Sequence, residues 1–237
     1  YRQTSWFVLV FITNRPVGLF KVQKTWRMKM IDLYTANTFN GQRVSIMLEE
    51  IELPYKAHSI DLKQGEQRQP DFLRLNPSGR IPVIVDHDAG FSEQLVVTQS
   101  TAILQYLAEK TKKLLPDTLS ARATVYEWMH FHAIDIGSVI FSAFYLQRRS
   151  SPKQITAAKL LRNRVHELYK YFDQQLAQQE FLAGDFYSIA DITALPAVIT
   201  QEQKLTDYLN LTRWSQQLKQ RAAVQRGLAV PCIGGES

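Results

Sequence analysis

The sequence contains very little cysteine. Its single thiol, Cys232, lies near the C-terminus. One thiol cannot form an intrachain disulfide, and it cannot supply the paired cysteines of a CxxC redox motif or a zinc site. The protein's own thiol is therefore not expected to be the centre of its chemistry. Nothing in the cysteine usage indicates an oxidising compartment.

Long hydrophobic runs are also missing. The apolar run Trp6–Ile12 is about a third of the ~20 residues that a helix needs to span a bilayer. It stands at the lower limit for the core of a signal peptide, and no small-residue cleavage site comes cleanly after it. The sequence therefore predicts no membrane association and a cytoplasmic location.

Acidic residues are absent from the first 30 positions, which carry six basic ones: Arg2, Arg15, Lys21, Lys24, Arg27 and Lys29. Subtracting these 6 from the 28 basic residues leaves 22, against 22 acidic residues. The body of the chain is neutral and lacks the basic stripe typical of nucleic-acid binders. No nucleic-acid partner is predicted.

The basic segment 1–29 has three interpretations from the sequence. It is an N-terminal extension, a targeting segment or a functional arm, and Met28 or Met30 is a natural start for the domain after it. At the other end, residues 232–237 are expected to form a C-terminal tail.

Residues 30–113 alternate between strand and helix patterns. Strands are expected over 30–34 and 55–61, with a turn at 36–41 and an amphipathic helix between them that Pro54 closes. Next along the chain come a short helix over 70–75, strands over 83–85 and 94–97, and a helix over 100–112. The order β-α-β-α-β-β-α predicts an α/β thioredoxin-like domain.

Strand patterns stop after Pro116. Long helices are expected over 121–146 and 153–179, a third begins near Ser188, and a fourth covers 211–221, so residues 119–231 are predicted to form an all-α helical domain. Ser188 and Asp191 have the spacing of a capping box, which predicts a structural cap for the third helix.

Two motifs in the first domain suit a peptide ligand. Pro82 stands at the mouth of a buried-type strand, so the main chain of Ile81 is expected to be free to pair with a ligand. Gln99 and Ser100 open a helix, where free N–H groups attract an anion. An open backbone edge beside an anion site fits a peptide with a free carboxylate.

These motifs occur in a familiar order. Asn-Pro-x-x-x-Ile-Pro, Gln-Ser-x-Ala-Ile-x-x-Tyr-Leu and, in the helical domain, Ser-Ile-Ala-Asp resemble the cytosolic glutathione S-transferase superfamily. Thr38-x-Asn40-Gly41 and the segment from Asp61 to Leu73 are similar to the bacterial Nu class, whose members include glutathione-dependent disulfide-bond reductases. The resemblance covers Met30 to about Pro231.

The resemblance implies a catalytic role for Thr38 and Asn40. A free thiol has a pKa near 8.5, so the glutathione thiolate must be stabilised to act at neutral pH. The Thr38 hydroxyl and the Asn40 amide would donate to it. The alternative is that both residues only cap the helix and shape the turn.

The resemblance also implies the glutathione-binding residues. Ile81 would pair with the peptide main chain beside a cis Pro82, and Ser100 and Gln99 would hold the γ-glutamyl end. Gln67 and Arg80 complete the predicted set. Two departures stand out: Leu160 occupies the place of a helical-domain arginine, and Phe39 stands where relatives have proline.

The first helix of the second domain is rich in aromatic residues. Its aromatic and histidine side chains have two interpretations, a hydrophobic co-substrate site or plain core: Trp128, His130, His132, Phe141, Phe144 and Tyr145. The two histidines lie two positions apart and point to different faces of a helix. No metal is predicted.

The function that the resemblance implies is enzymatic. Glutathione would be a co-substrate whose thiolate reduces a disulfide or peroxide or attacks a small electrophile, in a homodimer typical of the family. The alternative is a non-catalytic binding or regulatory module of the same fold. A thioredoxin-like oxidoreductase with its own redox pair is excluded by the cysteine count.

Overall fold

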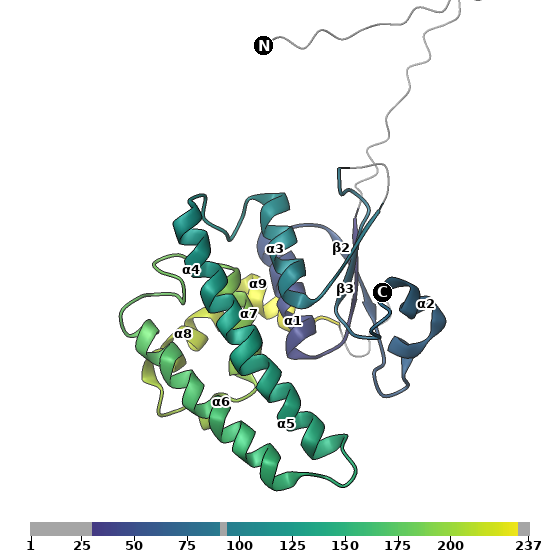
Figure 1. The fold of residues 1–237 in the computed structure, drawn as a ribbon. Helices are drawn as coiled ribbons and strands as arrows, with labels where there is room; N and C mark the ends of the chain where they lie inside the picture. The colour runs from purple at the N-terminus through teal and green to yellow at the C-terminus, as the bar shows by residue number, and fades with distance from the viewer. Residues whose placement is uncertain (1–29, 91–93, 232–237) are drawn as a thin grey trace, which may run out of the picture.

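The computed structural model describes residues 30–90 and 94–231. The extension 1–29, the tail 232–237 and Cys232 lie outside the described residues, so the predictions for them stay predictions. Figure 1 shows a sheet domain beside a larger helical domain, with α1 and α3 between the sheet and the other helices. The predicted fold, an α/β thioredoxin-like domain followed by an all-α domain, is confirmed.

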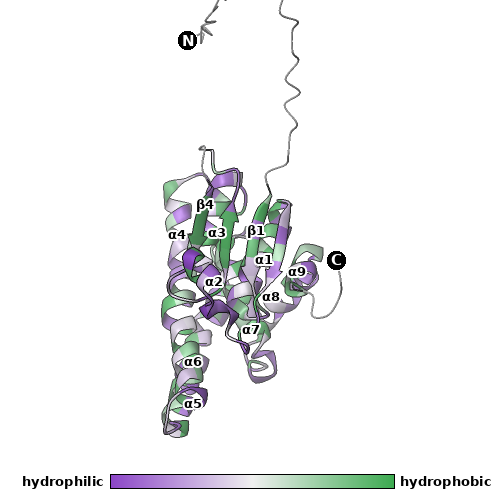
Figure 2. Ribbon diagram, turned by 90° about the vertical axis from the view of Figure 1, so that its right-hand side faces the viewer, coloured by the Kyte–Doolittle hydropathy of each residue, from purple (hydrophilic) through white to green (hydrophobic). Residues whose placement is uncertain are grey.

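Four strands form one mixed sheet in the order β2-β1-β3-β4. They are β1 (Ile31–Thr35), β2 (Tyr55–Ser59), β3 (Val83–Asp86) and β4 (Leu95–Thr98). β1 and β2 are parallel, whereas β3 is antiparallel to both β1 and β4. This is the predicted βαβ half followed by an antiparallel ββα half. β4 has the apolar sequence Leu-Val-Val before Thr98 and is coloured mostly hydrophobic in Figure 2.

The helices of the sheet domain are α1 (Phe39–Ile51), α2 (Pro70–Leu75) and α3 (Ser100–Thr111), with a 3-10 turn η1 (Glu66–Arg68) before α2. α1 and α3 pack against each other and against the helical domain, while α2 lies on the other side of the sheet (Figure 1). Apolar residues at helical spacing bury one face of α1, as predicted.

The helical domain differs from the prediction in two places. Its elements are α4 (Leu119–His130), the π-helix η2 (Phe131–Gly137), α5 (Ser138–Arg148), α6 (Ile155–Leu176), α7 (Ile189–Ile199), η3 (Glu202–Lys204), α8 (Leu209–Lys219) and α9 (Ala222–Leu228). The single helix expected over 121–146 is interrupted by the wider π turn. α9 was not predicted, because its seven residues are too few to show a clear period.

The structural cap of the helical domain is confirmed. Ser188 and Asp191 form a capping box at the start of α7. The buried Asp191 carboxylate accepts from the main-chain N–H of Leu182 at 3.0 Å and from the Trp214 indole at 2.9 Å. This carboxylate therefore joins the α7 start to the preceding loop and to α8.

The two domains meet on α1. α9 packs closely against it, since a Cβ added at Gly227 would lie 2.5 Å from the Ile46 main chain. The Ser45 hydroxyl donates to the Gly227 carbonyl at 2.6 Å. α7 packs on α1 as well. The helix that begins at the predicted catalytic turn is thus held by the second domain along its length.

The continuous helical stretch Leu119–Arg148 is long and apolar enough to cross a membrane by length and composition alone. Core helices of soluble proteins meet the same criterion. Here α4 packs on α7, and α5 packs on α6.

Candidate active site

Three predicted site segments come together at one edge of the sheet. Tyr34 at the end of β1 pairs with Val83 at the start of β3, which pairs in turn with Thr98 at the end of β4. The turn before α1, the segment at Ile81 and the start of α3 therefore share this edge. Segments far apart in the sequence meet here because of strand register alone.

The turn before α1 is fixed by Thr38 and Gly41. Thr38 is the N-cap of α1, and its hydroxyl oxygen accepts from the Gly41 N–H at 3.1 Å. A Cβ at position 41 would lie 2.4 Å from the Ala36 carbonyl and from the Thr35 hydroxyl. Only glycine fits there, which explains the Asn-Gly pair of the motif.

Asn40 presents a donor at this turn. Its side-chain oxygen accepts from Arg43 Nη1 at 2.6 Å and lies 3.5 Å from the Ser100 hydroxyl. Within the described part of the chain, its Nδ2 group has no hydrogen-bond acceptor, and neither does the Thr38 O–H. Both donors stand at the positive end of the α1 dipole, where an anion is favoured.

The Ile81–Pro82 peptide bond is cis, as predicted. Asn76 Nδ2 donates to the Arg80 carbonyl at 2.7 Å and fixes the turn that precedes it. Among the described residues, nothing bonds to the main-chain N–H or C=O of Ile81. These groups are available to a peptide ligand, as the sequence predicted.

The start of α3 is the predicted anion end of the site. Ser100 is only 8% exposed, and its hydroxyl accepts from Arg43 Nη1 at 3.2 Å. Gln99 is exposed and has φ 68° and ψ 118°, a strained conformation for a side chain larger than glycine. Its carbonyl caps the Ile103 N–H at 2.9 Å.

Arg43 is a further residue of this site, and the sequence motifs did not reveal it. Its side chain is 3% exposed and reaches both Asn40 and Ser100, so it joins the starts of α1 and α3. It also donates to the Thr193 carbonyl at 2.6 Å and to His132 Nδ1 at 3.0 Å. The sequence did offer one indication of Arg43: its helical spacing places it on the buried side of α1.

The other predicted contacts lie beside this edge. The Arg80 guanidinium stacks over the Phe141 ring, 5.4 Å from its centroid, and thereby links the Ile81 turn to α5. Gln67 Nε2 donates weakly to the Leu62 carbonyl at 3.5 Å, and its buried Oε1 has no partner in the described structure. The glutathione-binding roles of both residues stay predictions.

The aromatic helix divides between core and surface. Trp128 packs edge-on against Phe172, and His132 is fully buried. Burial, and after it the charge of Arg43, lowers the pKa of His132 well below its ordinary value, so the ring is neutral. The α5 aromatics remain exposed: Phe141, Phe144 and Tyr145.

Lys159 and Arg162, the basic residues nearest to Leu160, are the predicted substitutes for the missing helical-domain arginine, and neither bonds to a predicted site residue in the described structure. Leu160 is 66% exposed on α6. Arg162, the nearby candidate, bonds to Gln147 across the α5–α6 contact.

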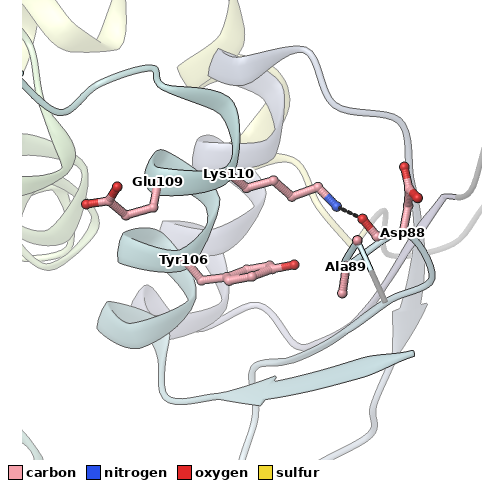
Figure 3. Close-up of a pocket in the computed structure, with 6 residues that line it drawn as sticks. Asp88, Ala89, Tyr106, Glu109 and Lys110 are labelled. Atoms are coloured by element: carbon pink, nitrogen blue, oxygen red, sulfur yellow. Dashed lines mark hydrogen bonds between the residues drawn. The ribbon is translucent and has the colours of Figure 1, made fainter. Parts of the chain in front are cut away.

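A hollow of about 390 Å³ lies at the far end of α3 from Ser100. Figure 3 shows Tyr106 and Lys110 projecting from α3 toward the loop at Asp88 and Ala89. Lys110 donates to the Asp88 carbonyl at 2.5 Å, as the dashed line marks. The residues that line this hollow do not include any of the predicted site residues.

The fold and the site define a class. A thioredoxin-like domain with a cis-proline turn, followed by a helical domain, matches family models for the N-terminal domain of glutathione S-transferase over residues 40–110 and its C-terminal domain over residues 134–222. These two matches cover more than half of the chain. The chain belongs to the glutathione S-transferase family.

Sequence relatives indicate which members of the glutathione S-transferase family this chain resembles. The chain is 34% identical to disulfide-bond oxidoreductase YfcG of Escherichia coli, over 87% of this chain and 98% of the relative. It is 32% identical to disulfide-bond oxidoreductase YghU of the same organism, over 94% of this chain and 83% of the relative. The predicted resemblance to the disulfide-reducing Nu-type members is confirmed.

Solved structures agree with the sequence relatives. A glutathione transferase from Burkholderia graminis, with two glutathione molecules bound per subunit, has a TM-score of 0.81 at 32% identity, covering 87% of this chain and 90% of that one. A glutathione transferase from Pseudomonas putida, with one glutathione disulfide bound per subunit, has a TM-score of 0.78 at 29% identity, covering 88% and 94%.

Proposed function

We propose that this protein is a glutathione-dependent disulfide-bond reductase of the Nu-class type, with glutathione as co-substrate. The observation that carries the proposal is the α1 start, where the Thr38 O–H and the Asn40 N–H₂ lack acceptors within the described residues. The names of the relatives support reduction of disulfides, and the bound glutathione in their structures supports the co-substrate.

The two donors would stabilise the glutathione thiolate. A hydrogen bond to a charged group contributes roughly 1.5–3 kcal/mol, and each pKa unit corresponds to about 1.4 kcal/mol. One or two such bonds from Thr38 and Asn40 lower the thiol pKa by about one to two units. A shift of about two units leaves the bound thiol largely ionised at neutral pH, which makes it a nucleophile.

The reduction needs two glutathione molecules. The bound thiolate attacks one sulfur of the substrate disulfide, the S–S bond breaks, and the other sulfur leaves as a thiolate that takes up a proton. A second glutathione thiolate then attacks the mixed disulfide, releasing the second substrate thiol and glutathione disulfide. No cysteine of the protein takes part, in keeping with its single Cys232. A peroxide or small electrophile would meet the same thiolate.

The remaining segments of the sheet edge would hold the peptide. The free N–H and C=O of Ile81 pair with the cysteinyl unit, and Ser100 with the α3 N-terminus receives the γ-glutamyl carboxylate. Gln99 contacts the same end, while Gln67 and Arg80 border the turn. The proposed chemistry needs no metal, and the described residues contain no group of three ligand-type side chains placed for one.

The alternative, a non-catalytic module, is less well supported. Its fold would be the same. Three relatives that the chain matches over most of their length are named as oxidoreductases or transferases. Retention on immobilised glutathione followed by turnover of hydroxyethyl disulfide separates the two, because a module binds without turnover.

The decisive variant is Thr38→Ala combined with Asn40→Ala. We expect at least about a hundredfold loss of disulfide reduction, from about one to two units of thiol pKa together with lost positioning of the sulfur. Asn37→Ala is the matched control, because Asn37 is exposed in the same turn and bonds only to Gln42 among the described residues. Undiminished reduction by the double variant would exclude this site.

We also propose a cytoplasmic homodimer without nucleic-acid or membrane partners. The exposed α5 aromatics support a protein contact on that helix, since Phe141, Phe144 and Tyr145 are each about half exposed. Sedimentation equilibrium tests the dimer. A purely monomeric protein at micromolar concentration would contradict it.

A further inference from the structure

Arg43 carries a buried positive charge at the junction of the two domains. It lies on α1, and its guanidinium meets four neutral acceptors: Asn40 Oδ1, the Ser100 hydroxyl, the Thr193 carbonyl and His132 Nδ1. A buried cation is costly unless an anion offsets it. No carboxylate within the described residues forms an ion pair with Arg43.

The guanidinium remains charged in this environment. Burial lowers the pKa of Arg43 to about 10, still well above neutral pH. The buried His132 ring is neutral and accepts at Nδ1. The charge therefore faces the starts of α1 and α3, the two places where a thiolate and a carboxylate of glutathione would bind.

The contact with Asn40 selects one orientation of its amide. An amide has an acceptor at one end and two donors at the other. Arg43 donates at 2.6 Å, so the Asn40 oxygen must face the guanidinium. The flipped amide would place N–H groups against N–H groups. The Asn40 donors are thereby directed away from Arg43.

We propose that Arg43 is the positioning residue of the sulfur site: it fixes the Asn40 amide with its N–H₂ toward the glutathione thiolate and anchors it to the helical domain. The inference rests on the proposed function of Thr38 and Asn40. Arg43 acts through Asn40 and does not touch the sulfur.

The anchor points come from the second domain. Arg43 Nε reaches the Thr193 carbonyl of α7, and Nη2 reaches His132 in the π-helix η2. Gly137 ends η2, and a Cβ there would lie 3.9 Å from Nη2. The planar fork of arginine bonds to both domains at once, which a lysine ammonium on a flexible stem does less well.

A double-mutant cycle tests the proposal. The pKa of enzyme-bound glutathione is measured from thiolate absorbance against pH in four proteins: wild type, Arg43→Met, Asn40→Ala and the double variant. We expect Arg43→Met to raise the thiol pKa by about one unit in the wild-type background. We expect no further rise in the Asn40→Ala background, because coupled residues are non-additive.

Two further variants separate positioning of the Asn40 amide by Arg43 from a general contribution of Arg43 to the stability of the protein. Arg43→Lys keeps a cationic donor for Asn40, so it should recover more than half of the thiol pKa shift while lowering the melting temperature. Gln42→Met, one position away on α1, is the control and should leave the thiol pKa unchanged. A thiol pKa that changes in step with the melting temperature across the variants would contradict positioning.

Equal pKa rises from Arg43→Met in both backgrounds would overturn the proposal, because Arg43 would then act on the thiolate directly. An unchanged thiol pKa would overturn it too. Wild-type protein that does not bind glutathione would instead overturn the proposed function, so the two failures are distinct.

If Arg43→Met does not fold, Arg43→Lys takes its place in the cycle, and the wild-type protein tests the premise that the Asn40 amide faces the thiol. The ¹⁵N side-chain resonance of Asn40, assigned by its loss in Asn40→Ala, should titrate with the thiol of bound glutathione. It should not titrate with bound S-methylglutathione, which has no thiol. A resonance that ignores the thiol would contradict the proposal.

Discussion

The two ends of α3 each hold a buried charge, and they hold it differently. At the first end, Arg43 meets Ser100 and other neutral partners. Near the last end, the Asp86 carboxylate is 1% exposed and is held by Lys110 at 2.5 Å and by the Tyr106 hydroxyl at 2.7 Å. One charge is matched by an opposite charge within the described structure, and the other is not.

The Asp86 pair serves the fold, whereas Arg43 lies at the proposed ligand site. The matched pair at Asp86 is complete without a ligand, and it joins β3 to α3 on the side of the hollow in Figure 3. The unmatched charge of Arg43 lies where the proposed anionic ligand binds. Four neutral acceptors hold Arg43 instead of a carboxylate, and one of them is Asn40, the proposed donor to the glutathione thiolate.

The largest expected effect is at the matched end. Asp86→Asn leaves Lys110 without its counter-charge, and we expect the free energy of unfolding to fall by about 3 kcal/mol. Glutathione retention of the folded protein should not change. Denaturant titration measures the loss. The control is Lys112→Gln, which breaks only an exposed pair and should cost less than about 0.5 kcal/mol.

At the unmatched end, Ser100→Ala should act on binding. Loss of the hydroxyl removes one contact to the γ-glutamyl carboxylate, and we expect KM for glutathione to rise about tenfold, the equivalent of about 1.4 kcal/mol. The value of kcat should change much less, because this contact is made equally in ground and transition states. Thr101→Ala in the same turn is the control. A fall in kcat alone would place Ser100 in the chemical step.

A smaller effect is expected from Tyr106→Phe. The variant removes one donor from Asp86 and leaves the Lys110 pair in place, so it should cost about 1 kcal/mol of unfolding free energy. Thermal melting in the wild-type and variant proteins measures it. A loss as large as that of Asp86→Asn would show that the hydroxyl, not the ion pair, holds the carboxylate.

The smallest expected effect is on how the free energy of unfolding depends on pH. Wild type and Asp86→Asn differ there by the titration of a single carboxyl group. Burial raises the pKa of Asp86, but Lys110, Tyr106 and the Asp88 N–H together lower it below its ordinary value. The ionised Asp86 carboxylate stabilises the fold at any pH above its pKa in the unfolded chain. This stabilisation is lost as the pH falls through the pKa of Asp86 in the folded protein. Unfolding measured toward acid should therefore show a steeper loss in wild type than in Asp86→Asn. Parallel curves would mean that Asp86 keeps its ordinary pKa.

Local pattern predicted most of the fold. The strands, the helix periods of α1 and α3, and the capping box of Ser188 and Asp191 all depend on spacing within a few residues. The cis Pro82 came from the resemblance, since proline alone predicts a trans bond in most cases. The boundaries of the two domains stay predictions.

Arg43 could not be predicted as part of the site. The family pattern directs attention to position 160 of the helical domain, which is Leu160, whereas the buried arginine lies on α1. Its four partners come from segments up to 150 positions away in the sequence. The π-helix and α9 were missed for a related reason, since packing against other helices decides them.

The sequence by itself predicted the parts of the site: a free main chain at Ile81 and an anion site at Ser100 from backbone constraints, and a catalytic turn at Thr38 and Asn40 from the resemblance. Neighbouring residues impose these backbone constraints. Only the tertiary structure decided how they work together. Strand register brought the three segments to one edge, and burial of Arg43 joined Asn40 to Ser100, because charge and burial depend on what the whole fold places around a side chain.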